Sequence, residues 1–100
     1  MAFIPNREEI AWAAGFFDGE GHVGAATKDG RNDLYIGISQ VDRRVLDRFR
    51  DAVGCGKVVG PYIHRVMEQR GNEQPRYYFQ TARFQHVQAI VAALWPFLPQ

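Results

Sequence analysis

The sequence predicts an α+β domain with the element order αββαββα, in which two hairpins form a four-stranded antiparallel sheet with the helices on one face. Apolar residues recur at helical spacing in three segments, and they alternate with polar or small residues in two pairs of segments between them. Each pair of alternating segments is interrupted by residues typical of turns. One hundred residues with 46% hydrophobic content suit a single domain, residues 1–100, with one core.

The first helix is expected to run from about Arg7 to Asp18. Asn6 followed by Glu9 resembles a capping box, in which the Asn oxygen accepts from a free amide of the first turn and the Glu reaches back. Four apolar side chains of this helix would pack in the core: Ile10, Trp12, Phe16 and Phe17.

Two hairpins follow the first helix. Residues 22–28 and 34–39 alternate with a period of two, and Asp29-Gly30 between them is a turn signal. Residues 57–66 and 76–81 form a second alternating pair around a polar loop. Antiparallel sheets commonly pack one face on a core, so the other face of this sheet would be left to solvent or to a partner.

Two further helices complete the order. Asp42 is a candidate N-cap for a helix whose apolar residues repeat at helical spacing as far as Gly54, which would end it. The last helix would begin at about Arg83, and Pro96 should kink or stop it.

Composition excludes several classes of protein. Cys55 is the single cysteine, so no intrachain disulfide is possible. No signal sequence and no apolar run long enough to span a bilayer is present, so we expect no membrane partner and a soluble, cytoplasmic protein, nucleoid-associated, or organellar if the source is a eukaryote. No Walker-type loop or dinucleotide fingerprint is present, so no organic cofactor is expected.

The charges and histidines add two constraints. The formal net charge is +1, with seven Lys or Arg against nine Asp or Glu in residues 1–56 and five against two in residues 57–100. This asymmetry permits a basic face without requiring one. His22, His64 and His86 have no Cys or His at zinc-ligand spacing, so zinc is not expected. His22 follows Gly21 directly and is a candidate contact to phosphate or water.

Small residues line one face of the first helix. Ala11, Ala14, Gly15 and Asp18 are spaced i, i+3, i+4 and i+7 and therefore share a face. Small side chains let two helix backbones approach closely, so a second helix is expected to pack there.

Two carboxylates mark a candidate site at the end of this helix. Gly19 and Gly21 flank Glu20, and they are expected to end the helix and to leave room for a phosphate or metal near its carboxylate. Asp18 is the second carboxylate, for which a structural role is favoured over a catalytic one.

Residues 13–21, AAGFFDGEG, resemble the signature of the LAGLIDADG homing endonuclease family. The segments at 38–42, 53–56 and 94–98 are similar to the family in the same order, so the resemblance covers nearly the whole chain. It implies the fold of the single-motif members of the family, in which the four-stranded sheet is saddle-like.

The resemblance also implies a function and a site. It implies a homodimeric, site-specific double-strand DNA endonuclease that uses Mg²⁺, or Mn²⁺, to cut a palindromic or nearly palindromic target. Glu20 would be the catalytic metal ligand with Gly19 beside it, and Gln40 would position water around the metal, although a Gln that merely caps its strand is equally compatible. Two sites are needed to cut two strands, so two chains would pair through four residues of the first helix: Ala11, Ala14, Gly15 and Asp18.

The sheet face opposite the core is the predicted DNA-binding surface, because a twisted antiparallel ribbon fits the major groove. Basic residues would attract phosphate: Lys28, Arg31, Lys57, Arg65, Arg70 and Arg76. Other polar side chains would contribute to base recognition: Tyr35, Ser39, Tyr78 and Gln80. The alternative is an ordinary solvated face. Arg43 and Arg44 could also reach phosphate, although paired arginines at a helix start are more often plain surface.

One position departs from the family. Members usually carry a basic residue, commonly Lys, shortly after the segment that matches residues 95–98, where this chain has Pro99-Gln100. The chain could be truncated, another cation such as Lys28 could substitute, or the protein could bind without cutting efficiently. Two alternatives therefore stay open: a catalytically weak or inactive DNA- or RNA-binding module, such as a regulator or maturase, and a small α+β scaffold whose motif is coincidental.

Overall fold

The computed structural model describes residues 3–28, 31–63 and 74–99. Along the chain lie α1 (Arg7–Glu20), β1 (Gly21–Lys28), β2 (Arg31–Gln40), α2 (Arg43–Val53), β3 (Lys57–Tyr62), β4 (Arg76–Thr81), α3 (Phe84–Leu94) and the short 3₁₀ helix η2 (Trp95–Phe97). The predicted order αββαββα is therefore confirmed. No helix within the described ranges has the length and apolar character needed to cross a membrane.

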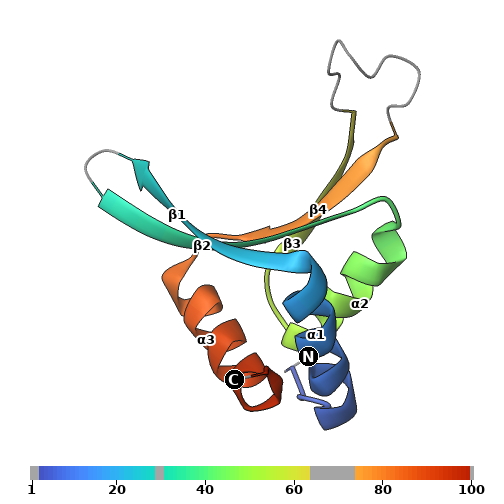
Figure 1. Cartoon of the computed structure of the whole chain (residues 1–100), viewed down its shortest axis with the longest axis vertical. Helices are drawn as coiled ribbons and strands as arrows, with labels where there is room; N and C mark the ends of the chain where they lie inside the picture. Colours follow the sequence, from blue (N-terminus) through green and yellow to red (C-terminus); the bar gives the residue numbers. More distant parts are fainter. Residues whose placement is uncertain (1–2, 29–30, 64–73, 100) are drawn as a thin grey trace.

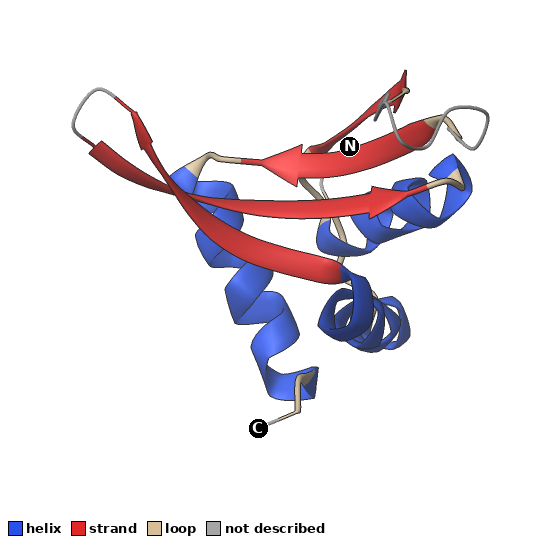
Figure 2. Cartoon of the chain, turned by 45° about the horizontal axis from the view of Figure 1, so that its top comes forward, coloured by secondary structure: helices blue, strands red, loops and turns tan. Residues whose placement is uncertain are grey.

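The four strands form one antiparallel sheet in the order β1-β2-β4-β3. The sheet curves so that its two hairpins rise at opposite ends, and all three helices lie beneath it (Figures 1 and 2). The sheet thus has a helix-covered face and an open, concave face, as the sequence predicts.

The core lies between the sheet and the helices. Ile36, Ile38 and Phe79 point from the sheet into it and are at most 2% exposed. The ring of Phe49 on α2 contacts that of Phe79 edge to face, with centroids 4.9 Å apart. Three residues of α3 close the core: Val87, Ile90 and Leu94. These residues recur at helical spacing on α3 and alternate on β2, as the sequence patterns predict.

The N-terminus of α1 confirms only half of the predicted capping box. The Glu9 amide donates to Asn6 Oδ1 at 3.1 Å, so Asn6 is the N-cap. The Glu9 carboxylate does not reach back but accepts two hydrogen bonds from Arg48 on α2, at 2.9 and 2.7 Å. This bidentate contact with the Arg48 guanidinium replaces the expected bond from Glu9 back to the start of the helix, and it connects α1 to α2.

The C-terminus of α1 differs from the prediction. The helix continues past Asp18 and through Gly19, and Glu20 is its last residue. Gly21 follows with φ −93° and ψ 166°, an extended conformation that begins β1 directly. No left-handed glycine ends the helix, and Gly19 lies within its last turn. Gly21 is instead required by packing, since a Cβ there would overlap the Phe17 ring.

The ends of α2 and α3 agree with the sequence. Asp42 Oδ1 accepts from the Arg44 amide at 2.9 Å, and Gly54 ends α2 with φ +80°. α3 stops at Leu94, and Pro96 lies in the 3₁₀ turn that follows.

The strand ends differ in detail from the predicted bounds. β2 begins at Arg31 rather than at residue 34, and β3 ends at Tyr62, so its predicted extension through Ile63 is wrong. The β3–β4 register shifts between Val59 and Tyr62, which interrupts regular pairing before Tyr62 pairs with Arg76 at the end of β3. The turn Asp29-Gly30 and residues 64–66 of the predicted strand lie outside the described residues.

Candidate functional site

The end of α1 and the end of β2 meet at one place in the molecule. Glu20 is the last residue of α1, Gln40 is the last residue of β2, and Gly21 pairs with Ile38 across the two strands. This register brings Gln40 Nε2 to 3.2 Å from Glu20 Oε2, to which it donates a hydrogen bond. The structure therefore brings together the two residues that the sequence singles out as catalytic candidates.

The donors at this place fit a hard divalent cation. Gln40 binds Oε2 of Glu20, so the Oε1 atom remains available, and a Cβ at Gly19 would meet no atom within 4 Å. Carboxylate and carbonyl oxygens are the ligands that Mg²⁺ and Ca²⁺ prefer. Among the residues that the structure describes, no three His, Cys, Asp or Glu side chains form a group able to hold a metal. Backbone carbonyl oxygens, such as that of Gly19, and water are further candidate ligands.

Side chains of the open face form rows across the sheet. His22 of β1 pairs with Gly37 of β2, Gly37 pairs with Gln80 of β4, and Gln80 pairs with Lys57 of β3. The adjacent row joins Ser39 to Tyr78. Because Ile36, Ile38 and Phe79 point to the core, their neighbours in sequence point to the open face. Strand alternation thus predicts this face correctly.

A groove of about 990 Å³ runs along this region of the sheet. Glu20 is part of its lining, so the candidate metal ligand and the open face belong to one concave surface. Its lining also includes several polar residues named from the sequence: Tyr35, Ser39, Lys57, Tyr78 and Gln80.

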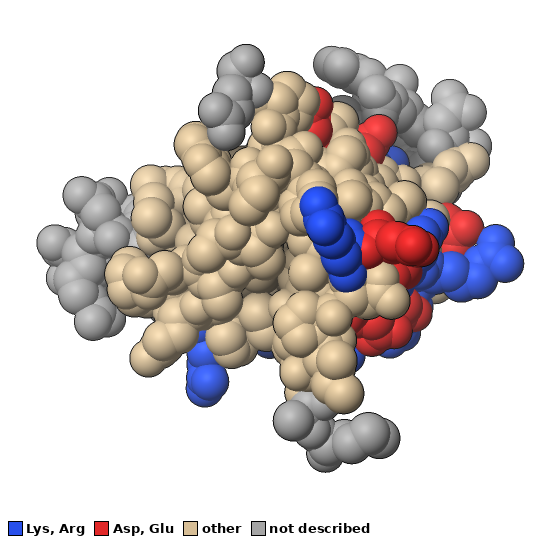
Figure 3. All heavy atoms as spheres, turned by 90° about the horizontal axis from the view of Figure 1, so that it is seen from below, with Lys and Arg blue, Asp and Glu red and all other residues tan. Residues whose placement is uncertain are grey.

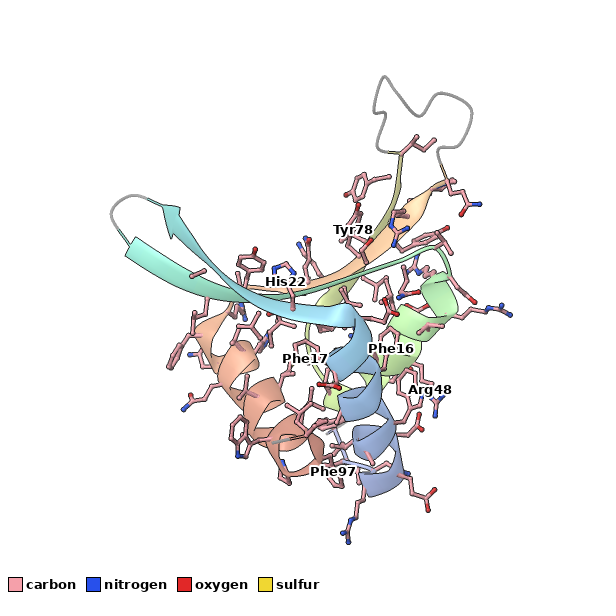
Figure 4. All side chains as sticks on the ribbon, viewed as in Figure 1. Phe16, Phe17, His22, Arg48, Tyr78 and Phe97 are labelled. Atoms are coloured by element: carbon pink, nitrogen blue, oxygen red, sulfur yellow. The ribbon has the colours of Figure 1, made fainter. Side chains whose placement is uncertain are left out.

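His22 and Tyr35 form a pair on the open face that the sequence did not indicate. His22 Nε2 lies 3.1 Å from Tyr35 Oη, and the two rings meet edge to face with centroids 5.3 Å apart. Tyr35 is directly opposite Gly24, where a Cβ would overlap its ring, so Gly24 leaves the space in which Tyr35 lies. Figure 4 shows His22 and Tyr78 on the open side of the sheet and Phe16 and Phe17 on the helix side.

Arg76 is held on the same face by a neutral residue. Its Nε donates to Ser39 Oγ at 2.7 Å, and its Nη2 donates to the Ser39 carbonyl oxygen at 3.4 Å. The sequence named both residues as DNA contacts but did not indicate that they touch, because the contact depends on which strands are neighbours.

The arginines of α2 are each bound to a carboxylate. Arg43 pairs with Asp47, Arg44 with Asp42, Arg48 with Glu9 and Arg50 with Asp51. Hydrogen bonds from Arg44 lower the pKa of Asp42. Seen from below, charged side chains gather on the side of α2, and the side of α3 is mostly uncharged (Figure 3). The arginines at the start of α2 therefore belong to local ion pairs.

Four predicted DNA contacts cannot be placed. Lys28 and Arg31 pair with each other at the tip of the β1–β2 hairpin, but their side chains lie outside the described part of the structure. Arg65 and Arg70 lie wholly outside the described residues.

The predicted dimer face of α1 needs one correction. Ala14 is 0% exposed and belongs to the core of its own chain, so its side chain has no surface to offer a second copy. Ala11, Gly15 and Asp18 are exposed, and a Cβ at Gly15 would meet no atom within 4 Å. Ala13 and Ala14 are the buried residues of α1, so Ala14 lies on the face of the helix that packs against the core.

No protein-family model matches the chain, and no curated protein matches its sequence. The structure, however, is similar to several solved homing endonucleases. The match to I-CvuI, solved with its target in the presence of Ca²⁺, has a TM-score of 0.70 and 20% identity over 93% of this chain and 58% of that one. The archaeal intron-encoded I-Vdi141I, solved with DNA, matches with a TM-score of 0.69 and 18% identity over 90% of this chain and 55% of that one.

A third match names the family. The LAGLIDADG homing endonuclease I-GzeII, solved with a DNA target, matches with a TM-score of 0.68 and 28% identity over 100% of this chain and 32% of that one. The chain thus spans 58%, 55% and 32% of the length of these three proteins. It has the fold of the LAGLIDADG homing endonucleases, which confirms the resemblance carried by residues 13–21.

Proposed function

We propose that this protein is a site-specific DNA endonuclease that acts as a homodimer on a palindromic or nearly palindromic target and depends on Mg²⁺ or Mn²⁺. The observation that carries the proposal is the contact between Glu20 and Gln40 beside the groove of the open face. I-CvuI, I-Vdi141I and I-GzeII, which share the fold, were each solved with DNA.

Glu20, with the backbone carbonyl of Gly19, would hold the divalent cation. Such an ion would polarise a phosphodiester and lower the pKa of a coordinated water. Gln40 holds one oxygen of Glu20 by its amide, which fixes the plane of the carboxylate and directs the other oxygen. The Gln40 side chain uses its amide nitrogen in this bond, so its amide oxygen is available to orient a water.

The open face would hold the duplex. Lys57 and Gln80 are adjacent in one row and Ser39 and Tyr78 in the next, so cationic, amide and hydroxyl groups alternate over short distances. Amides and hydroxyls can contact base edges, and cations contact phosphate. A net charge of +1 per chain is small for a DNA-binding protein, and a dimer would double the number of phosphates contacted.

One chain carries one Glu20, and hydrolysis of both strands needs two such sites. Small, exposed residues on α1, Ala11 and Gly15, leave its backbone accessible to a second helix. Pairing of two α1 helices related by a two-fold axis would bring two Glu20 residues toward that axis, and a two-fold dimer binds a palindromic target.

The test begins with a randomised duplex library, from which bound sites are recovered in Ca²⁺ and cut ends are sequenced in Mg²⁺. We expect enriched palindromes, cut in both strands, and a loss of cleavage of about 100-fold or more with Glu20→Gln while binding is retained. Enrichment without cutting would identify a binding module. No enrichment at all, or undiminished cleavage by the Glu20→Gln variant, would refute the proposal.

A further inference from the structure

Arg76 differs from the arginines of α2 in what holds it. Its guanidinium donates to the hydroxyl and the carbonyl oxygen of Ser39, at 2.7 and 3.4 Å, and its surroundings are half-buried. Neither acceptor carries a charge. Among the ion pairs of the described residues, Arg76 takes part in none, whereas each α2 arginine is neutralised by a carboxylate.

This arrangement leaves a positioned cation with unused hydrogen-bonding capacity. A guanidinium has five N–H donors in a rigid fork, and two of its nitrogens are engaged by Ser39. Both contacts fix the orientation of the side chain without cancelling its charge. Lys57 and Arg83, which line the groove, have exposed side chains, and among the described residues no contact of this kind holds them.

Arg76 and Glu20 contact neighbouring residues of β2 from elements on its two sides. Glu20 directly precedes β1, which lies on the side of β2 away from β4, and it is bound by Gln40, the residue after Ser39. On the other side, Ser39 pairs with Tyr78 of β4, and Arg76 reaches back diagonally to it. Neighbouring strands are about 5 Å apart, so a phosphate lying over Ser39 could contact groups on both sides.

We propose that Arg76, positioned by Ser39, binds the phosphate that is cut at Glu20. This inference rests on the proposed function and assigns to this chain the residue that neutralises charge on the far side of the scissile phosphate from the carboxylate. Two N–H groups along one edge of the guanidinium plane match the two non-bridging oxygens of a phosphate. A charge that is positioned before the reaction stabilises a developing anion without reorganisation.

Binding to modified duplexes tests the contact without relying on cleavage. The enriched duplex is made with a neutral methylphosphonate at the scissile position, and its affinity is measured in Ca²⁺ against the unmodified duplex. We expect the modification to weaken binding to the native protein by about tenfold more than binding to the Arg76→Ala variant, because the variant has already lost that charge-assisted contact. A methylphosphonate two nucleotides away is the control and should affect both proteins equally.

Cleavage by variants tests the geometry. Arg76→Lys keeps the charge but loses the fork, and we expect single-turnover cleavage to fall about tenfold while affinity in Ca²⁺ changes little. Ser39→Ala should lower the cleavage rate in the same way, and Ser39→Thr, which retains the hydroxyl, should restore it. Arg7→Lys, on the exposed start of α1, is the matched control and should cleave normally. Thermal unfolding establishes that each variant is folded.

The outcomes separate this inference from the proposed function. If no duplex is enriched, the proposed function fails and this inference with it. If the duplex is bound but Arg76→Ala remains as sensitive to the scissile methylphosphonate as the native protein, Arg76 does not contact that phosphate and only this inference is overturned. Arg76→Lys cleavage at the native rate would likewise overturn the role of the fork.

Discussion

The amide of Gln40 and the carboxylate of Glu20 form a unit in which one side chain orients the other. Removing the amide with Gln40→Ala leaves Glu20 exposed and free to rotate. We expect this variant to bind DNA in Ca²⁺ with nearly native affinity and to cleave in Mg²⁺ about 10 to 100 times more slowly, because a ligand that must be ordered during the reaction stabilises the transition state less.

Gln88→Ala provides the matched control for this measurement. Gln88 is an exposed amide on α3, remote from the open face, and its removal should not change cleavage. Equal cleavage by the Gln40→Ala variant and the native protein would show that the amide merely caps its strand.

Glu9 and Arg48 give the fold a dependence on pH. The side-chain hydrogen bond from Arg48 holds the pKa of Glu9 below its usual range, so ionised Glu9 favours the folded state. This contribution is complete above the pKa of Glu9 in the unfolded chain and disappears as the pH falls through the lowered pKa of the folded protein. We expect Glu9→Gln to lower the melting temperature at neutral pH and to have no effect in stronger acid.

The pair also contacts an aromatic ring, and the pH series can separate the two interactions. The guanidinium carbon of Arg48 lies 3.8 Å from the centroid of the Trp12 ring. Arg48→Ala removes this contact as well, so it should destabilise the protein at every pH. A constant difference between Glu9→Gln and the native protein across the acid range would contradict the assigned pKa shift.

At the level of residues, the amino-acid sequence indicates which residues form the candidate site, but it does not indicate which of them contact one another. Glu20 and Gln40 were named separately, from a motif and from the context around residue 40. Their hydrogen bond follows from the β1–β2 register, which places residues far apart in sequence side by side. The His22–Tyr35 pair was missed for the same reason, since it depends on a diagonal contact across two strands.

Gly54 shows how a single residue ends an element. It lies at φ +80°, and a Cβ there would come within 2.6 to 2.7 Å of ring atoms of Phe3. We expect Gly54→Ala to lower the free energy of unfolding by at least about 1 to 2 kcal/mol, from the cost of a left-handed conformation alone. Urea denaturation measures the change.

Gly19→Ala is the informative comparison for Gly54→Ala. Gly19 is in the last turn of α1, and nothing would contact an added Cβ. Alanine has the higher helix propensity, so this variant should be as stable as the native chain or more stable. If Gly19→Ala and Gly54→Ala lowered the stability by similar amounts, the left-handed conformation of Gly54 would not explain the loss.

The elements themselves were largely predictable because their signals are local. Asn6, Asp42 and Gly54 fix helix ends through contacts within a few residues, and alternation assigned the core side of β2. The end of α1 was not predictable, since Gly19 can either end a helix or continue it. Nor was the strand order: two hairpins can join in several ways, and alternation does not specify that β2 lies beside β4.

For the whole molecule, three surface regions differ in shape, charge and side-chain size. The open face carries the groove lined by Glu20 and the contact between Arg76 and Ser39, and α2 carries arginines that are neutralised locally. α1 offers an exposed strip of small residues, Ala11 and Gly15. This strip is the surface on which the proposed homodimer depends.

Gly15 distinguishes a dimer interface from an ordinary helix surface. In a chain that does not pair through α1, Gly15→Ala should stabilise the protein by about 1 kcal/mol, because alanine favours the helix and no neighbour is within 4 Å of the added Cβ. In the proposed dimer the same methyl group separates two closely packed backbones, so the dimer dissociation constant should rise about tenfold, and Gly15→Leu should yield monomers.

Sedimentation equilibrium gives the dissociation constant, and chemical denaturation at low concentration gives the stability of the monomer. Ala89→Leu enlarges a small, exposed residue on α3 and should leave the dimer intact. A folded Gly15→Leu monomer that binds half of the palindrome in Ca²⁺ but no longer cuts both strands would connect the α1 surface to double-strand cleavage. Native dimerisation by Gly15→Leu would place the interface elsewhere, and Glu20 of the second copy could not then be assumed to lie near the first.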